Sequence, residues 1–284
     1  MFKAYIFHFP TEQLKAIEPC NGDNAINQFA QSLPDGVYTT MRTVQKTKIF
    51  QLSFHLKRLM EGFELTNTEF EYDINRIKPA LFNIIKQHPA KENRIRIHIP
   101  FSSAQDCYFM VEELTTPSES AYNFGVRVIT NSIFRSNPEA KLSSFLRESE
   151  NLKNYLINKN IEEALMVNNS GEILEGLSSN FFAFKGDELY TAEKGILFGS
   201  TRDVILRIAE SNRMKIVLLP IKIFELNDIN EAFIASTSRG IIPVVEIDEL
   251  QIGSGSPGKN TLFLQNQIND WMWNQSEKII QSED

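Results

Sequence analysis

The irregular order of strand-like and helix-like stretches is the feature that most constrains how this 284-residue chain can fold. Alternating side chains predict strands over 94–99, 108–112 and 126–130, because successive residues of a strand face opposite sides of a sheet. Apolar side chains at helical spacing predict a helix over 53–65 and another that begins near Asp73. Since strands and helices do not alternate as regular β-α-β units, we expect an α+β fold.

A short polar segment with a proline, 115–120, divides the chain. This composition is typical of a linker, and the chain is long enough for two lobes that each have a core. We therefore predict an N-terminal α/β lobe over 1–116 and a C-terminal lobe over 122–284. Within the second lobe, short strands are predicted over 163–167, 172–174, 181–185, 188–191, 216–219, 231–236 and 243–247, and helices over 146–159, from Ser200 onward and over 259–273.

The composition, 42% hydrophobic and 23% charged, is that of an ordinary globular protein. The formal net charge of −7 and the scattered basic residues argue against a nucleic-acid surface, which needs a basic stripe. The two cysteines, Cys20 and Cys107, lie far apart, which fits a reducing cytoplasm and offers no zinc framework. Neither a signal peptide nor an apolar stretch of membrane-spanning length is evident, so we predict a cytoplasmic protein.

Short motifs that mark many enzyme classes are missing from the sequence. It contains no P-loop, no HExxH and no GxSxG. The four histidines show no metal-ligand spacing, so no metal site is predicted: His8, His55, His88 and His98.

Small polar residues instead gather at three places where a predicted strand meets a turn or a helix. In 197–202, a glycine, a serine and a threonine can present N–H and O–H groups to a phosphate at a helix N-terminus. The segment 235–240 has three hydroxyl residues and a glycine, which can form a second anion-binding turn. In 172–180, Glu175 places one carboxylate at a strand end. Taken alone, each segment also has a simpler explanation. Segment 197–202 would be a helix cap, 235–240 a polar turn, and Glu175 in 172–180 a solvated glutamate.

Taken together and in order, these segments resemble the class IV aminotransferase family. The segment 163–182 is similar to the family pattern of EAL, a hydrophobic residue and Asp or Asn, followed by G-x-I/V-x-E-G-x-x-S-N. The resemblance covers about 35–258 and implies a two-lobed fold type IV enzyme, with a small N-terminal α/β lobe and a larger β-barrel-like lobe with helices. The matching segments are 35–40, 55–59, 163–182, 189–191, 199–202 and 236–244.

The resemblance also implies a cofactor, pyridoxal 5′-phosphate, and roles for the matching residues. Glu175 would face the pyridine nitrogen and keep it protonated, so that the ring can accept electrons. Arg58 would hold the phosphate, because its guanidinium fork suits a tetrahedral oxyanion. The phosphate cup would be completed by Ser200, Thr201, Thr237 and Ser238.

Three lysines before Glu175 are candidates for the covalent link to the cofactor. Lys141 lies at the spacing found in relatives and follows 137–140, which breaks regular structure. Lys153 and Lys159 fall within a predicted helix, where they are expected to be solvated. Many relatives carry an asparagine shortly after the lysine, whereas this chain does not. We predict Lys141 as the catalytic residue, which would also move the proton during the reaction.

The resemblance defines the substrate site less sharply. Tyr38 would lie near the reactive face of the cofactor. Arg96, His98 and Arg239 are candidates for binding a substrate carboxylate, because the carboxylate-binding arginine of the D-amino-acid branch has no counterpart in 100–102. A paired or solvent-facing strand residue would explain Arg96 and His98 equally well.

Three functions remain open at this point. The first is amino-group transfer between an amino acid, with branched-chain substrates as one option, and a 2-oxo acid. The second is a lyase of the 4-amino-4-deoxychorismate type, which uses the same lysine and releases pyruvate. The third is a catalytically inactive binding relative, against which Lys141, Glu175 and Arg58 argue. The resemblance further implies a homodimer.

Overall fold

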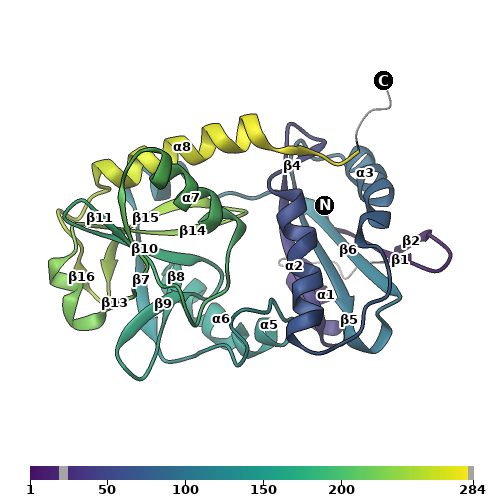
Figure 1. Ribbon diagram of the computed structural model, residues 1–284, viewed down its shortest axis with the longest axis horizontal. Helices are drawn as coiled ribbons and strands as arrows, with labels where there is room; N and C mark the ends of the chain where they lie inside the picture. Colours follow the sequence, from purple (N-terminus) through teal and green to yellow (C-terminus); the bar gives the residue numbers. More distant parts are fainter. Residues whose placement is uncertain (19–24, 281–284) are drawn as a thin grey trace. The chain divides into compact units, whose positions relative to one another are not determined.

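The computed structural model describes residues 1–18 and 25–280, so that Cys20 lies outside the described residues (Figure 1). The chain divides into two compact units. Unit 1 comprises Met1–Thr115, Ala140–Glu148 and Met272–Asp284, and unit 2 comprises Thr116–Glu139 and Ser149–Trp271. This division differs from the predicted lobe over 122–284, because two segments of that range belong to unit 1.

Unit 1 is built on an antiparallel sheet with the strand order β17-β4-β3-β5-β6-β1-β2. Its strands are β1 (Lys3–His8), β2 (Gln13–Ile17), β3 (Gly36–Val44), β4 (Lys48–Ile49), β5 (Asn93–Pro100), β6 (Asp106–Glu113) and β17 (Glu277–Lys278). Its helices are α1 (Ala25–Ser32), α2 (Leu52–Leu65), η1 (Ile74–Ile77), α3 (Lys78–Gln87), η2 (Phe101–Ser103) and α5 (Ser144–Glu148).

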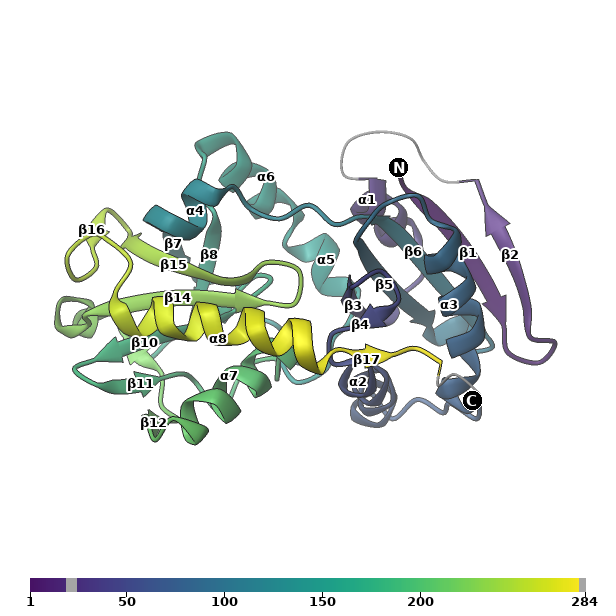
Figure 2. The same cartoon turned by 90° about the horizontal axis from the view of Figure 1, so that it is seen from above.

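The two faces of this sheet are covered by different helices (Figure 2). Side chains alternate along β3 and β5, so Val37 and Ile97 pack with the apolar face of α2 in the main core of the unit. Tyr38 faces the other way and packs with Ile26 of α1 in a second cluster. Because a one-residue step reverses the face, neighbouring residues of β3 reach different surroundings.

The sequence patterns predicted neither α1 nor α4 (Glu119–Phe124), and two of the helices that they did predict differ in detail. Asp73 caps its helix by accepting a hydrogen bond from the Asn75 N–H at 2.9 Å, but the first turn is the 3-10 helix η1. The helix predicted over 146–159 is two helices, α5 and α6 (Glu150–Lys159), which meet at Ser149. The chain passes from unit 1 to unit 2 at this break.

Unit 2 contains a strand path with the order β12-β11-β10-β14-β15-β7-β8-β9-β13. Its strands are β7 (Val126–Asn131), β8 (Glu163–Val167), β9 (Glu172–Gly176), β10 (Asn180–Lys185), β11 (Glu188–Tyr190), β12 (Lys215–Val217), β13 (Ile221–Lys222), β14 (Glu231–Ser236), β15 (Gly240–Ile247) and β16 (Leu250–Gln251). Its other elements are α4 (Glu119–Phe124), α6, α7 (Ser200–Ser211), η3 (Ile223–Asp228) and most of α8 (Lys259–Gln275).

One additional pairing turns part of this path into a barrel. β10 pairs with β9 as well as with β14, through the residue pair Asn180 and Glu175. The ring β10-β14-β15-β7-β8-β9 is thereby closed, and its interior is filled by apolar residues such as Phe181, Ile234 and Ile242. The predicted barrel-like lobe is thus present, and Glu175 lies at the pair that closes it.

None of the helices within 1–18 and 25–280 is long and apolar enough to span a bilayer.

Candidate functional site

A buried polar cluster in unit 1 contains the predicted phosphate ligand Arg58. His55 and Arg58 lie three residues apart on α2 and therefore share one face of the helix. Arg58 Nη2 donates to Thr39 Oγ1 at 2.7 Å and contacts His55 Nδ1 at 3.1 Å, while the Thr39 hydroxyl lies 2.7 Å from the same nitrogen. A guanidinium has only donors, so His55 Nδ1 must accept and carry no proton.

The ionisation of His55 agrees with this geometry. Burial, followed by the positive charges of Arg58 and Lys141, lowers the pKa of His55 well below its ordinary value. The imidazole is therefore neutral at physiological pH and leaves Arg58 with its full charge. Neither His55 nor Thr39 had a role assigned from the sequence, although the spacing of His55 and Arg58 on one helix indicated that they are neighbours.

Lys141 is held at the first residues of β3. Its carbonyl accepts the Tyr38 N–H at 3.0 Å, and Leu142 forms an antiparallel bridge with Val37. The Ser143 N–H donates to the Gly36 carbonyl at 3.0 Å. These hydrogen bonds satisfy backbone groups at the start of β3, which explains why 140–148 belongs to unit 1 rather than to the second lobe.

The Tyr38 ring lies next to two cations of unit 1. Lys141 Nζ is 4.8 Å from the ring centroid, and Arg96 Cζ is 5.4 Å from it. Arg96 also donates to Asn27 Oδ1 at 3.0 Å, and burial lowers its pKa to about 10, so that it stays charged at neutral pH. Tyr38, Arg96 and Lys141 are therefore brought together, as a substrate-binding role for the first two requires.

His98 is placed differently from these residues. Its side chain is fully buried, and Nε2 donates to the Pro34 carbonyl at 3.0 Å. The ring also makes an edge contact with Tyr108, with 6.5 Å between ring centroids. This surrounding is that of a paired core histidine, which is the alternative that the sequence left open, so we do not include His98 in the substrate site.

The stability of the protein is expected to depend on pH through His98. Burial lowers its pKa to about 4, while the unfolded chain has an ordinary histidine pKa near 6.5. Above pH 6.5 both states are neutral; between pH 6.5 and 4 only the unfolded state gains a proton, so the folded state loses stability as the pH falls. The loss should be on the order of 3 kcal/mol by pH 4.

Urea unfolding of the wild type and His98→Gln between pH 7.5 and 4 measures this effect. The glutamine amide can still donate to the Pro34 carbonyl but does not titrate. The difference in unfolding free energy between the two proteins should therefore shift with pH in favour of the variant. A difference that stays constant across the range would show that His98 is not the group responsible.

Unit 2 fixes the carboxylate of Glu175 from two sides. Arg135 Nε donates to Glu175 Oε1 at 3.1 Å, and Asn180 Nδ2 donates to Glu175 Oε2 at 3.1 Å. Arg135 Nη2 also donates to the Leu177 carbonyl at 2.9 Å, and all three polar side chains are buried. A buried carboxylate paired with a guanidinium remains ionised, which suits it to hold a protonated ring nitrogen.

Two of the predicted phosphate residues of unit 2, Ser200 and Thr237, also meet. Ser200, the first residue of α7, places its Oγ 2.9 Å from Thr237 Oγ1 in the turn between β14 and β15. Thr201 Oγ1 is buried and has no hydrogen-bond partner among the described residues. A Cβ on Gly199 would lie 2.2 Å from Asn180 Oδ1, so this approach requires a glycine. The N-terminus of α7 therefore offers hydroxyl and N–H donors suited to an anion.

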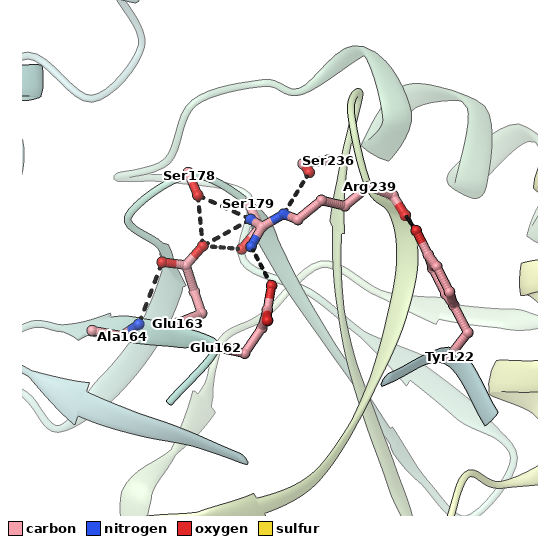
Figure 3. A network of polar contacts seen from close by, with 8 residues as sticks. All are labelled: Tyr122, Glu162, Glu163, Ala164, Ser178, Ser179, Ser236 and Arg239. Carbon is pink, nitrogen blue, oxygen red and sulfur yellow. Dashed lines mark hydrogen bonds and ion pairs between the residues drawn. The ribbon is translucent and has the colours of Figure 1, made fainter. Parts of the chain in front are cut away.

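Arg239 lies in the same turn, but its guanidinium contacts the protein's own carboxylates (Figure 3). Nη1 donates to Glu162 Oε1 at 3.0 Å, and Nη2 donates to Glu163 Oε2 at 2.9 Å. Nε and Nη2 also donate to Ser236 and Ser178. Two carboxylates already neutralise Arg239, so we do not include it in the substrate site.

Comparison with known proteins identifies the family to which the chain belongs. The model of the family "Amino-transferase class IV" matches residues 36–247, most of the chain. The chain belongs to this family. The sequence-based assignment is thereby confirmed, and the protein is a pyridoxal-phosphate-dependent aminotransferase.

Individual members of the class IV aminotransferases show how far the similarity extends. The branched-chain-amino-acid aminotransferase of Pseudomonas aeruginosa is 26% identical over 257 residues, which cover 81% of each chain. The D-alanine aminotransferase of Bacillus licheniformis is 26% identical over 87% of this chain and 90% of its own. The structure of the branched-chain amino acid aminotransferase from Escherichia coli matches 97% of this chain and 96% of its own, with a TM-score of 0.77 and 19% identity. This likeness confirms the two-lobed α+β fold of type IV.

Several residues of this aminotransferase had no assignment from the sequence alone. Arg135 lies outside the strands and helices predicted from the sequence, and its partner Glu175 is 40 positions away. Asn180 belongs to the family-like segment, but its two hydrogen bonds to Glu175 and to the Leu197 carbonyl depend on barrel closure. The only sequence signal for Arg135 is a basic side chain six residues before Lys141, outside any predicted strand or helix.

Proposed function

We propose that this aminotransferase uses pyridoxal 5′-phosphate to move an amino group from an amino acid to a 2-oxo acid. The observation that carries the proposal is the buried Glu175 carboxylate, which Arg135 and Asn180 hold in a fixed orientation. Such a group is needed by a cofactor whose ring nitrogen must stay protonated. The family match and Lys141 at the family's spacing support the same reading.

The residues present fit this cofactor. Arg58 would bind the phosphate, Lys141 would form the covalent link and Glu175 would face the ring nitrogen. The remaining phosphate ligands would be Ser200, Thr201, Thr237 and Ser238. The unused hydroxyl of Thr201 at the start of α7 is the donor that such a phosphate would engage.

Each of these groups has a defined task in the reaction. Pyridoxal phosphate, when bound, supplies an aldehyde that combines with the amino group and a ring that withdraws electrons. The Lys141 amine would hold the cofactor covalently and, as a free amine, would accept the proton that leaves the substrate α-carbon. Neutral His55 orients Arg58 without weakening its charge, because Nδ1 only accepts a hydrogen bond.

The substrate is proposed to be an amino acid whose carboxylate is held by Arg96 and contacts Tyr38. The Tyr38 ring contacts both Lys141 and Arg96 in unit 1, and Arg96 is charged at neutral pH. Relatives named for branched-chain amino acids and for D-alanine match equally well, so both substrate classes are to be tested. We also propose a homodimer, as the family resemblance implies, which sedimentation analysis will test.

A visible absorption spectrum of the purified protein with added pyridoxal phosphate tests the function. We expect a band from the lysine-bound cofactor that borohydride fixes onto Lys141, and that changes when a true substrate is added from a panel of L- and D-amino acids. Formation of a new amino acid from a 2-oxo acid should follow. Fixation on Lys153 or Lys159 would overturn the lysine assignment. Pyruvate release from aminodeoxychorismate without amino transfer would indicate the lyase instead.

A further inference from the structure

Arg239 is the last residue of a short turn that the proposed phosphate site uses. The turn joins β14 to β15, and its ends pair through Ser236 and Gly240. Gly240 has a φ of +67°, a conformation that suits glycine, and the Arg239 carbonyl accepts the Tyr122 hydroxyl at 2.7 Å. The backbone of this turn is thus held on one side by α4, while the Arg239 side chain extends toward the start of β8 (Figure 3).

The partner of Arg239 at β8 is a carboxylate with several hydrogen bonds. Glu163 is 2% exposed, and its Oε2 accepts from Arg239 at 2.9 Å, from Ser178 at 2.8 Å and from Ser179 at 3.2 Å. Burial would raise the pKa of Glu163, but the charge of Arg239 and the hydrogen bonds from Arg239 and Ser178 outweigh it and hold that pKa below its ordinary value. Both members of the pair are therefore ionised at neutral pH.

Close packing fixes where Glu163 lies. A Cβ on Gly176 would come within 2.8 Å of Glu163 Cγ and 2.4 Å of Ser179 Oγ, so the absence of a side chain lets both approach. Gly176 directly follows Glu175, and Ser179 directly precedes Asn180. The Glu163 carboxylate thus connects the segment that carries the Glu175–Asn180 pair to the turn that carries Thr237.

We propose that Arg239 is a positioning residue which, through its ion pair with Glu163, holds the 236–240 turn in the geometry that binds the cofactor phosphate. The inference rests on the proposed function. Ser236 receives a hydrogen bond from Arg239 Nε, and the next residue, Thr237, meets Ser200 of α7. Loss of the ion pair would free the turn to move, and donors must stay within a fraction of an ångström of their ligand to retain affinity.

The test compares binding of pyridoxal 5′-phosphate and of pyridoxal, which lacks the phosphate, to the full chain. Arg239→Met should weaken binding of pyridoxal phosphate by about tenfold, equivalent to 1.4 kcal/mol, and binding of pyridoxal by much less. The phosphorus-31 resonance of the bound phosphate should also shift in the variant. A merely structural role would weaken both ligands equally and leave that resonance in place.

Two further variants keep the comparison interpretable. Glu163→Gln/Arg239→Met removes both charges, so that no buried carboxylate is left unpaired if the single variant does not fold. It should show the same selective loss for the phosphate-bearing ligand. Arg207→Met is the matched control, because Arg207 pairs with Asp203 at 2.8 Å at an exposed site of unit 2. The affinity of this variant for both ligands should equal that of the wild type.

Each result decides between the two proposals. A wild type that prefers pyridoxal phosphate while the Arg239 variants keep that preference would overturn the positioning role alone. An equal loss for both ligands would overturn it as well. A wild type without any preference for the phosphate would contradict the proposed phosphate site and this inference together.

Discussion

Replacing Lys141 with alanine is expected to reduce amino-group transfer by at least about 10³-fold, because one amine both binds the cofactor and moves the proton. The fold should persist, since the hydrogen bond from the Tyr38 N–H goes to the main-chain carbonyl of residue 141. Single-turnover assays with a substrate identified in the panel, and thermal unfolding of both proteins, measure the two effects.

Lys159→Ala is the matched control for this variant. Lys159 is exposed at the end of α6, so its removal should change neither the cofactor spectrum nor the rate. Small primary amines added to Lys141→Ala should restore part of the activity, because they can replace the missing proton acceptor. Full activity in Lys141→Ala, or borohydride fixation of the cofactor on another lysine of the wild type, would refute the assignment.

The second large effect is expected for Glu175→Gln, which should lower kcat roughly 10²-fold, as loss of a charge aimed at the reacting system typically does. An amide cannot keep the ring nitrogen protonated, so electron withdrawal weakens while substrate binding persists. The Michaelis constant should therefore change far less than kcat. Steady-state kinetics with saturating cofactor separates the two constants.

Two further variants test whether the effect is specific to residue 175 and to its negative charge. Glu172→Gln changes a half-buried carboxylate on the same strand, β9, whose partner is Asn168 at 2.7 Å, and should leave kcat unaffected. Glu175→Asp keeps the charge but shortens its reach, so it should retain more activity than Glu175→Gln. Equal kcat for Glu175→Gln and the wild type would exclude an electronic role for Glu175.

Both predictions concern residues that the sequence singled out. Local sequence patterns explain why these residues could be recognised. The α2 helix and the strands β5 and β6 follow from side chains that repeat every two to four residues, which the chain encodes between near neighbours. The segment around Glu175 has a motif made of adjacent residues, and Lys141 is found from its spacing to that motif.

The neighbours of these residues could not be found in the same way. Arg135 meets Glu175 across 40 positions, and Arg239 meets Glu163 across 76 positions. Neither pairing leaves a periodic trace, since each depends on how the barrel strands lie beside one another. The same holds for 140–148, which joins unit 1 because β3 has backbone groups that require partners.

The sequence by itself determined the fold class and the family, and it singled out as candidates the lysine at the family's spacing and the glutamate of the family-like segment. Only the tertiary structure decided which arginine does what: Arg135 holds Glu175, Arg58 lies against neutral His55, and Arg239 is paired with Glu163. The physical reason is that a guanidinium forms hydrogen bonds only with acceptors that lie within about 3 Å of it. Only folding brings acceptors that are distant in the sequence to that distance.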